Sequence, residues 1–223
     1  MQDSKDRKII LLKEVLDQEN FLHTDYRLPE FNTHKFKDHR LYSTAEEVFK
    51  SLGGINMDIP ANLGMHLQYQ GLLIQIDDEL HFNRYRKISL ESSFYKDHSG
   101  FKVLEYLRNC RIEEKECIKS GLAGSNWHNP KAKKMFGDSE EPGDLSMERN
   151  GSSAWKLRAW IDFIQDISGE IMGYKVLRIS VYDKLMVNNK IQSLGTLMKT
   201  SQKKNYEYIA KYLVRRIINI KGS

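Results

Sequence analysis

The segment Leu72–Asp77 is the clearest strand signal in the chain, and it constrains the fold most because acids and a histidine follow it directly. It is short and mostly apolar, and a Gln70-Gly71 turn precedes it, which is the pattern of a strand that leaves a tight turn. Two earlier stretches, Ile55–Ile59 and Met65–Tyr69, predict further strands. We therefore expect adjacent antiparallel strands joined by tight turns in this part of the chain.

Apolar residues recur at helical spacing in several other segments, which predicts helices around these strands. A start signal at Ser43-Thr44-Ala45-Glu46 and a stop at Gly53-Gly54 bound one of them. Other predicted elements are helices over 5–20, Phe101–Cys117, Ala154–Met172 and 205–220, a strand over Tyr174–Tyr182, and a long loop over Gly121–Gly151 anchored by Trp127 and Phe136.

The order of these elements predicts one α/β domain, of the α+β kind, over residues 1–223. A chain of this length is enough for one good core. The predicted core comprises residues 43–86 and 152–184, an insertion of helix and loop fills 87–151, and terminal helices cover 5–20 and 205–220.

The composition is that of an ordinary globular protein, with 40% hydrophobic and 29% charged residues. No apolar run approaches the roughly 20 residues of a membrane span, so no membrane partner is expected. The charged N-terminus lacks a signal-peptide pattern, and two cysteines form no disulfide framework in a chain this long. We expect a cytoplasmic protein with Cys110 and Cys117 as core thiols; a zinc site that adds His98 or His128 is the alternative.

Acidic side chains and an imidazole follow one another at the end of the Leu72–Asp77 strand. Strand side chains alternate between faces, so an extended path beyond the strand would place Asp77, Glu79 and His81 on one face. Carboxylates and imidazole are ligands for Mg²⁺ or Mn²⁺, and such a cation activates water and clamps a phosphodiester. We therefore predict a metal site at these three residues, which are also the catalytic candidates. An amphipathic edge strand with a solvated polar face is the alternative interpretation.

Basic residues gather in groups along the chain, whose formal net charge is +5. Groups that converge in space form a phosphate-binding surface, whereas scattered groups are ordinary solvated charges. The candidates for substrate binding are Arg84 and Arg86 just beyond the acids, Trp127 as a base-stacking residue, and Lys131, Lys133 and Lys134 after it. A surface loop anchored by its tryptophan is the alternative for the last group.

The predicted helix Ala154–Met172 carries a further catalytic candidate, Lys156, which can reach a scissile phosphate from a helix beside the core. Arg158 and Asp162 lie four residues apart on the same helix and are predicted to form a surface ion pair. The sequence contains no phosphate-binding glycine loop, no Gly-x-Ser-x-Gly turn and no His-Glu-x-x-His helix.

Two stretches, Ile74–His81 and Gly173–Ile179, resemble the restriction-endonuclease-like PD-(D/E)XK superfamily, most closely its very-short-patch-repair endonuclease-like branch. That branch has an acidic strand end followed by a histidine, and a late helix that leads through Gly-Tyr or Gly-Phe into a Val-Leu-Arg strand. The chain also resembles an uncharacterised bacterial family with a Glu-Leu-His-Phe-Asn-Arg-Tyr-Arg signature, here Glu79–Arg86, and a Trp-Lys-x-Arg-Ala helix, here Trp155–Ala159. The resemblance implies a restriction-endonuclease-like core of order αβββ, a helical insertion, αβ and a C-terminal helix.

The same resemblance implies a metal-dependent nuclease that hydrolyses DNA in repair, restriction or phage defence. RNA is an alternative substrate, and double-strand cutting favours a two-fold homodimer with the C-terminal helix as the candidate contact. Members of the superfamily have acids where this chain has His66 and Gln75, and Asp58 is only a distant substitute. The alternative function is therefore a catalytically degenerate protein of the same fold that binds nucleic acid or a partner protein.

Overall fold

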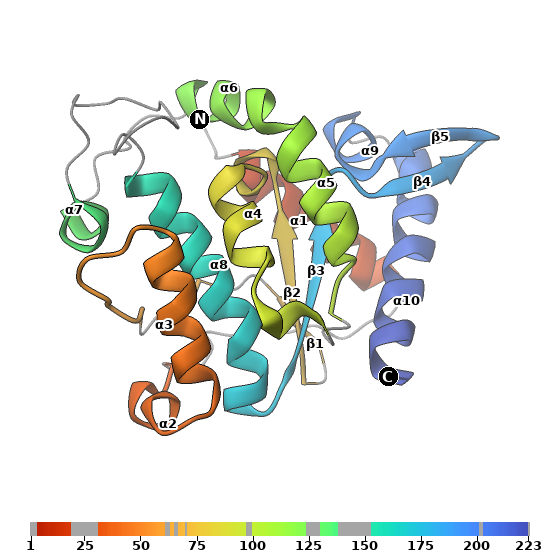
Figure 1. Cartoon of the computed structure of the whole chain (residues 1–223). Coiled ribbons are helices and arrows are strands. Elements are labelled where there is room, and N and C mark those ends of the chain that lie inside the picture. The colour runs from red at the N-terminus through yellow and green to blue at the C-terminus, as the bar shows by residue number, and fades with distance from the viewer. Residues whose placement is uncertain are drawn as a thin grey trace.

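The computed structural model describes residues 4–18, 31–60, 63–64, 67–69, 71–96, 100–123, 130–137, 153–200 and 203–222. These residues form a mixed α/β structure that is mostly helical and has two small sheets (Figure 1). The elements in chain order are α1 (Ser4–Gln18), α2 (Thr33–Lys37), α3 (Leu41–Ser51), β1 (Leu67–Tyr69), β2 (Leu72–Asp77), the 3-10 turn η1 (Glu79–His81), α4 (Arg84–Leu90), the 3-10 turn η2 (Ser93–Lys96), α5 (Val103–Ile112), α6 (Glu114–Ala123), α7 (Pro130–Phe136), α8 (Ser153–Met172), β3 (Lys175–Ser180), β4 (Lys184–Val187), β5 (Lys190–Ser193), α9 (Leu194–Thr200), the 3-10 turn η3 (Lys203–Asn205) and α10 (Tyr206–Gly222). No helix among the described residues is long and apolar enough to cross a membrane.

The larger sheet has the strand order β1-β2-β3, with β2 in the centre. β1 pairs antiparallel with β2 across a turn in which Gly71 has φ +77°, a left-handed value that favours glycine. β3 pairs parallel with β2, from Leu72 opposite Lys175 to Asp77 opposite Ser180. Parallel neighbours need a long crossover connection, and α8 is the last helix of that connection.

One face of this sheet is apolar and packs against the first and last helices of the chain. Alternate residues of β2 and β3 point to this face because strand side chains alternate. The buried cluster there includes Leu72, Ile74, Ile76, Leu177 and Ile179 from the strands, Leu12, Val15 and Leu16 from α1, and Ile209, Leu213 and Ile217 from α10. Burying each such side chain contributes about 1.5–3 kcal/mol, so the hydrophobic effect holds this face.

The opposite face of the sheet is covered by α8, which is buried over most of its length (Figure 1). Its apolar side chains, including Trp155, Trp160 and Phe163, join a second buried cluster with side chains of α3, α4, α5 and α7. At the end of α8 a Cβ on Gly169 would lie only 2.6 Å from the Tyr174 carbonyl oxygen. Glycine therefore allows the chain to turn closely from α8 into β3.

Several predicted elements are confirmed. The predicted strand Leu72–Asp77 is β2, and the predicted helix Ala154–Met172 is α8 with one more residue at its start. The predicted strand Tyr174–Tyr182 contains β3, and α1 and α10 correspond to the predicted terminal helices. In each of these, apolar residues recur at the period of the element, which is the primary local signal.

Other local predictions are wrong. The segment Ile55–Ile59 contains no strand, so the antiparallel pairing expected there is made by β1 and β2 alone among the described residues. The predicted helix Phe101–Cys117 is two helices, α5 and α6, with Glu113 between them. The predicted loop over 121–151 holds the end of α6 and all of α7, where Phe136 is buried as expected. The ribbon of β4 and β5 and the helix α9 were not predicted.

The chain does not remain extended beyond Asp78, which corrects the predicted alternation. The Asp78 side chain accepts a hydrogen bond of 3.1 Å from the Leu80 amide and caps η1. The Asn83 side chain then accepts from the amides of Tyr85 and Arg86 and caps α4. Asp and Asn are preferred at such caps because their oxygens satisfy the first free amides of a helix.

Candidate functional site

Charged side chains meet in the interior between the sheet and α8, and we call this set the Asp–Arg network. The strands contribute Asp77 and Arg178 on the face that the apolar cluster does not use. α8 contributes Asp162 and Asp166, which are four residues apart and so lie on one side of the helix. The remaining members are His81 from η1 and Arg86 from α4, and no member of the network is more than 3% exposed.

Arg178 is the centre of the network because its guanidinium contacts both β2 and α8. Its Nη1 lies 2.6 Å from Asp77 Oδ1, and its Nε donates to Asp166 Oδ1. Its Nη2 donates to the Asp162 carbonyl oxygen at 2.9 Å and to Gln165 Oε1 at 3.0 Å. Burial alone lowers the pKa of Arg178, but the nearby aspartates outweigh it and raise that pKa above its usual range. The group is therefore a permanent cation.

Arg86 approaches the same aspartates from α4. Its Nη2 donates to Asp166 Oδ2 at 2.7 Å, and its Nη1 donates to Ser89 Oγ at 3.2 Å and to Tyr95 OH at 3.3 Å. Its Nε has no hydrogen-bond partner and lies 3.9 Å from Asp162 Oδ2. Asp166 is thus held between two guanidinium groups.

His81 bonds to Asp162 and lies close to two other carboxylates. Its Nδ1 lies 2.9 Å from Asp162 Oδ2 and 3.5 Å from Asp77 Oδ1. An ionised carboxylate only accepts hydrogen bonds, so Nδ1 carries the proton and donates it to Asp162. The other ring nitrogen, Nε2, has no hydrogen-bond partner and lies 3.7 Å from Asp78 Oδ1. Burial alone raises the pKa of Asp162, but His81 and Arg178 outweigh it and lower that pKa well below its usual range.

The charges of the network nearly cancel. Three carboxylates face two guanidinium groups and the imidazole of His81, so the three aspartates and two arginines together carry a formal charge of −1. Removing one partner from a buried ion pair costs about 3–5 kcal/mol, because the remaining charge loses its partner in a medium that solvates it poorly. The network therefore makes the fold depend on each of its members.

The ligand atoms of Asp77, His81 and Asp162 lie within 4.8 Å of one another, which meets the distance requirement for a metal site. Carboxylates and imidazole are also the right donors for a divalent cation. However, Asp77 Oδ1 accepts from Arg178, and Asp77 Oδ2 accepts from Tyr106 OH at 2.9 Å. Both carboxylate oxygens of Asp162 lie within hydrogen-bond distance of His81 Nδ1. With the guanidinium of Arg178 among these carboxylates, the residues in this arrangement do not fit a divalent cation.

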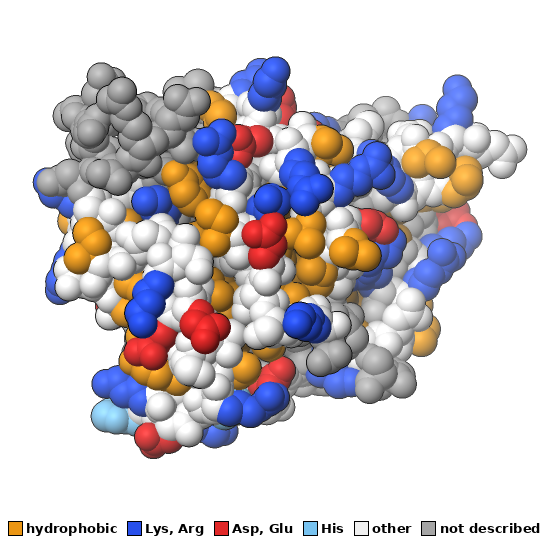
Figure 2. All heavy atoms as spheres, viewed as in Figure 1, with side chains coloured by type: hydrophobic (Ala, Val, Ile, Leu, Met, Phe, Trp, Pro, Cys, Tyr) orange, Lys and Arg blue, Asp and Glu red, His pale blue; other side chains and the backbone are white. Residues whose placement is uncertain are grey.

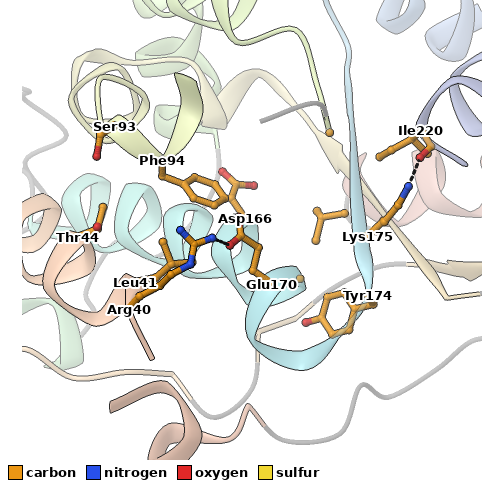
Figure 3. Close-up of a pocket in the computed structure, with 13 residues that line it drawn as sticks. Arg40, Leu41, Thr44, Ser93, Phe94, Asp166, Glu170, Tyr174, Lys175 and Ile220 are labelled. Atoms are coloured by element: carbon orange, nitrogen blue, oxygen red, sulfur yellow. Dashed lines mark hydrogen bonds and ion pairs between the residues drawn. The ribbon is translucent and has the colours of Figure 1, made fainter. Parts of the chain in front are cut away.

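A cavity of about 440 Å³ opens beside Asp166, near the start of β3 (Figure 3). Arg40 and Glu170 form an ion pair of 2.6 Å at its wall, and Lys175 Nζ donates to the Ile220 carbonyl oxygen at 2.8 Å. Figure 3 shows Asp166 between Phe94 and Glu170 in the lining of this space. The charged groups around the cavity are therefore already paired within the protein.

Glu79, a predicted metal ligand, has different partners from Asp77 and His81. Its carboxylate pairs with Lys8 Nζ at 2.9 Å and with Lys199 Nζ at 3.2 Å. Burial alone raises the pKa of Glu79, but Lys8 outweighs it and lowers that pKa. The predicted common face of Asp77, Glu79 and His81 is wrong because η1 turns Glu79 toward α1 and α9.

The predicted phosphate-binding residues are in different environments. Arg84 is half-exposed and pairs with Glu114 at 2.6 Å, whereas Arg86 is buried in the network. Lys131 pairs with Asp58 at 2.9 Å, and Lys133 and Lys134 are exposed on α7. Trp127, His66, His98 and His128 lie outside the described residues.

The residues that sequence analysis singled out on α8 are also in environments that differ from those predicted. Lys156 is mostly buried, with its Nζ 5.7 Å from the centre of the Tyr85 ring, and burial lowers its pKa. Asp162 is 2% exposed and bonds to His81, so the predicted surface ion pair with Arg158 is wrong. Cys110 and Cys117 are buried free thiols, and burial raises the pKa of each to about 12, as fits core residues.

Sequence reasoning missed Asp166, Arg178 and the two tyrosines, Tyr95 and Tyr106, that donate to the aspartates. The sequence does contain a signal for the two charged residues. Asp162 and Asp166 interrupt the apolar pattern of a helix that is otherwise core-forming, and Arg178 interrupts an apolar strand. Charged residues are almost never fully buried unless they are paired, so these interruptions predict mutual partners.

A sequence model for DUF7255, a family of unknown function, matches residues 47–200, from within α3 to the end of α9. The match includes every member of the Asp–Arg network. Searches of curated proteins and of solved structures found no match.

Proposed function

The chain belongs to the DUF7255 family, whose function is unknown, and we propose that it binds nucleic acid while its buried aspartates serve folding rather than hydrolysis. The observation that carries the second half of this proposal, folding rather than hydrolysis, is the contact of 2.6 Å between Arg178 Nη1 and Asp77 Oδ1. A metal-dependent nuclease needs a cation at such an aspartate, and here a side chain of the protein supplies the positive charge.

The arrangement of strands supports a relation to the restriction-endonuclease-like core. β1 and β2 form an antiparallel hairpin, and α8 leads into a strand parallel to β2. We propose that these elements correspond to the later strands and the crossover helix of that core. The aspartate at the end of β2 then occupies an ancestral catalytic position that Arg178 has neutralised.

The charge distribution supports nucleic acid as the partner. The chain has a formal net charge of +5, and the three aspartates and two arginines of the network contribute −1 to it. The residues outside the network therefore carry one more positive charge than the whole chain. A surplus of Lys and Arg at the surface attracts the phosphate backbone, and that attraction weakens with salt.

A second candidate is the metal-dependent nuclease, which is favoured by the proximity of the Asp77, His81 and Asp162 ligand atoms. A Mg²⁺ or Mn²⁺ ion would bind there only if Arg178 left Asp77. The two candidates differ in their response to chelation, because binding through lysines needs no metal and hydrolysis does.

The test measures binding and cleavage together on the purified chain. Labelled duplex DNA, single-stranded DNA and duplex RNA are titrated in EDTA at several salt concentrations, and supercoiled plasmid is incubated with Mg²⁺ and with Mn²⁺. We expect binding in EDTA that falls linearly in log K against log salt, and intact plasmid. Absence of binding to every nucleic acid contradicts the proposal. Metal-dependent nicking that Asp77→Asn abolishes contradicts it in favour of the nuclease.

A further inference from the structure

The strands β4 and β5 form a separate two-stranded ribbon that projects at the edge of the molecule beside α10 (Figure 1). They are joined by Asn188 and Asn189, which have φ values of +48° and +60°. Two consecutive left-handed residues are characteristic of the tight hairpin turn that matches the twist of the strands. The ribbon is therefore a defined structural element.

One face of the ribbon is anchored in the core. Leu185 and Val187 are 7% and 4% exposed and belong to the apolar cluster shared by the sheet, α1 and α10. This attachment fixes the direction in which the opposite face points. The ribbon can therefore present side chains outward with little loss of conformational freedom on binding.

The outward face of the ribbon exposes two large apolar side chains. Met186 and Ile191 are cross-strand partners, and they are 62% and 70% exposed. Lys184 and Ser193 lie on the same face by the alternation of strand side chains. Figure 2 shows apolar and basic side chains together at this end of the molecule. Apolar side chains grouped at the surface indicate a contact surface when something else identifies the partner.

The charge around the ribbon identifies the partner. The 23 residues Lys184–Tyr206 include β4, β5, α9, η3 and the first residue of α10, and this stretch of sequence contains lysines and no acid. The lysines are Lys184, Lys190, Lys199, Lys203 and Lys204; all are exposed, and Lys199 also pairs with Glu79. Such a segment is repelled by basic partners and attracted to a polyanion.

We propose that the β4–β5 ribbon enters the major groove of duplex DNA, with Met186 and Ile191 against base edges and Lys184 of the same face on one flanking phosphate. Lys190, which pairs with Val187 of the other face and is exposed beside the turn, reaches round the edge of the ribbon to another phosphate. The inference rests on the proposed function, to which it adds the contact surface and the form of the nucleic acid. The major groove of B-form DNA admits a two-stranded ribbon, and its thymine methyl groups are apolar partners for such side chains. The major groove of A-form RNA is too deep and narrow for this contact.

The test compares two double variants of the ribbon by titration with duplex DNA and with duplex RNA of the same sequence. Lys184→Gln/Lys190→Gln is expected to reduce the salt slope by about 2, one for each lost phosphate contact. Met186→Ser/Ile191→Ser is expected to weaken DNA binding about tenfold or more without changing that slope. Neither variant of exposed residues is expected to change the thermal unfolding midpoint.

Matched controls lie elsewhere on the surface. Lys35→Gln/Lys37→Gln removes two exposed lysines of α2, at the far end of the molecule in Figure 1. Leu104→Ser/Ile112→Ser removes two exposed apolar side chains of α5, which are 82% and 57% exposed. We expect the lysine control to change the slope less than the ribbon variant, and the apolar control to leave affinity unchanged.

The outcomes separate the inference from the proposed function. A wild-type chain that binds no nucleic acid contradicts both. If the wild-type chain binds DNA and the ribbon variants bind it equally tightly, the inference alone is overturned. Duplex RNA binding that is as strong as DNA binding and equally sensitive to Met186→Ser/Ile191→Ser also overturns it. Loss of a homodimer in that variant, measured by sedimentation, would assign the face to a second copy of the chain and overturn it as well.

Discussion

The two faces of the β1–β2–β3 sheet are built from alternate residues of the same strands, yet they are stabilised in different ways. The face toward α1 and α10 carries apolar strand side chains such as Ile76 and Ile179. The face toward α8 carries Asp77 and Arg178, which are completely buried. A shift of one residue along either strand would exchange the faces, so the register of β2 and β3 is fixed by both.

The difference between the faces lies in how specific their contacts are. Apolar contacts are non-directional, and volume-conserving changes usually cost less than about 1.5 kcal/mol. A buried polar network is stable only when every member has its partners, and a partly satisfied network is costly. We therefore expect the charged face to tolerate substitution far less than the apolar face.

The largest effect is expected from Arg178→Met, which keeps the length of the side chain but leaves Asp77 and Asp166 without their central partner. The expected loss is about 3–5 kcal/mol in the free energy of unfolding, because two buried carboxylates lose a cation. Urea denaturation followed by circular dichroism measures it. A loss below about 1 kcal/mol would mean that the two faces do not differ in this respect.

Asp162→Asn tests the charge of the network through pH. The pKa of Asp162 is lowered in the folded protein from its ordinary value of 3.8, so its stabilising effect is complete above that value and is lost as pH falls below it. The wild type should therefore lose stability on acidification below about pH 4, and the variant should lose less. Unfolding curves from pH 7 to pH 3 measure the difference. At pH 7 the variant should be about 3 kcal/mol less stable, and parallel pH profiles would contradict the account.

Tyr106→Phe removes a hydroxyl that donates to Asp77 Oδ2 at 2.9 Å inside the network. A hydrogen bond to a charged group contributes about 1.5–3 kcal/mol, so we expect a loss in that range. Tyr206→Phe is the matched control, because its hydroxyl donates to Glu14 at 2.7 Å at the exposed surface. The control should change the unfolding free energy by less than about 1 kcal/mol. Equal losses would show that burial of the carboxylate is irrelevant.

The smallest effect is expected on the apolar face. Ile76→Val removes one methyl group next to Asp77 in the chain but on the other side of the sheet. We expect a loss of about 0.5–1.5 kcal/mol, measured by the same urea denaturation. A loss as large as that of Arg178→Met would remove the distinction between the faces.

The sequence predicts the framework of this fold better than its centre. β2, β3 and α8 have apolar patterns that determine their secondary structure locally. The network depends on contacts such as Asp77 with Arg178, which are 101 residues apart in the chain, and no local pattern encodes that pairing. The prediction for Glu79 failed for a further reason, since the cap formed by Asp78 ends the strand and redirects the side chain.

The central claim is that Arg178, and not a metal ion, neutralises the aspartates. The most direct measurement is the thermal unfolding midpoint of the wild-type chain in EDTA, in Mg²⁺ and in Mn²⁺, with bound Mn²⁺ quantified by electron paramagnetic resonance. A cation at 100 times its dissociation constant would add about 2.7 kcal/mol to the free energy of unfolding. The account predicts the same midpoint in all three conditions and no tightly bound Mn²⁺. A higher midpoint in Mn²⁺ with one bound ion per chain would contradict it and would favour a metal-dependent nuclease.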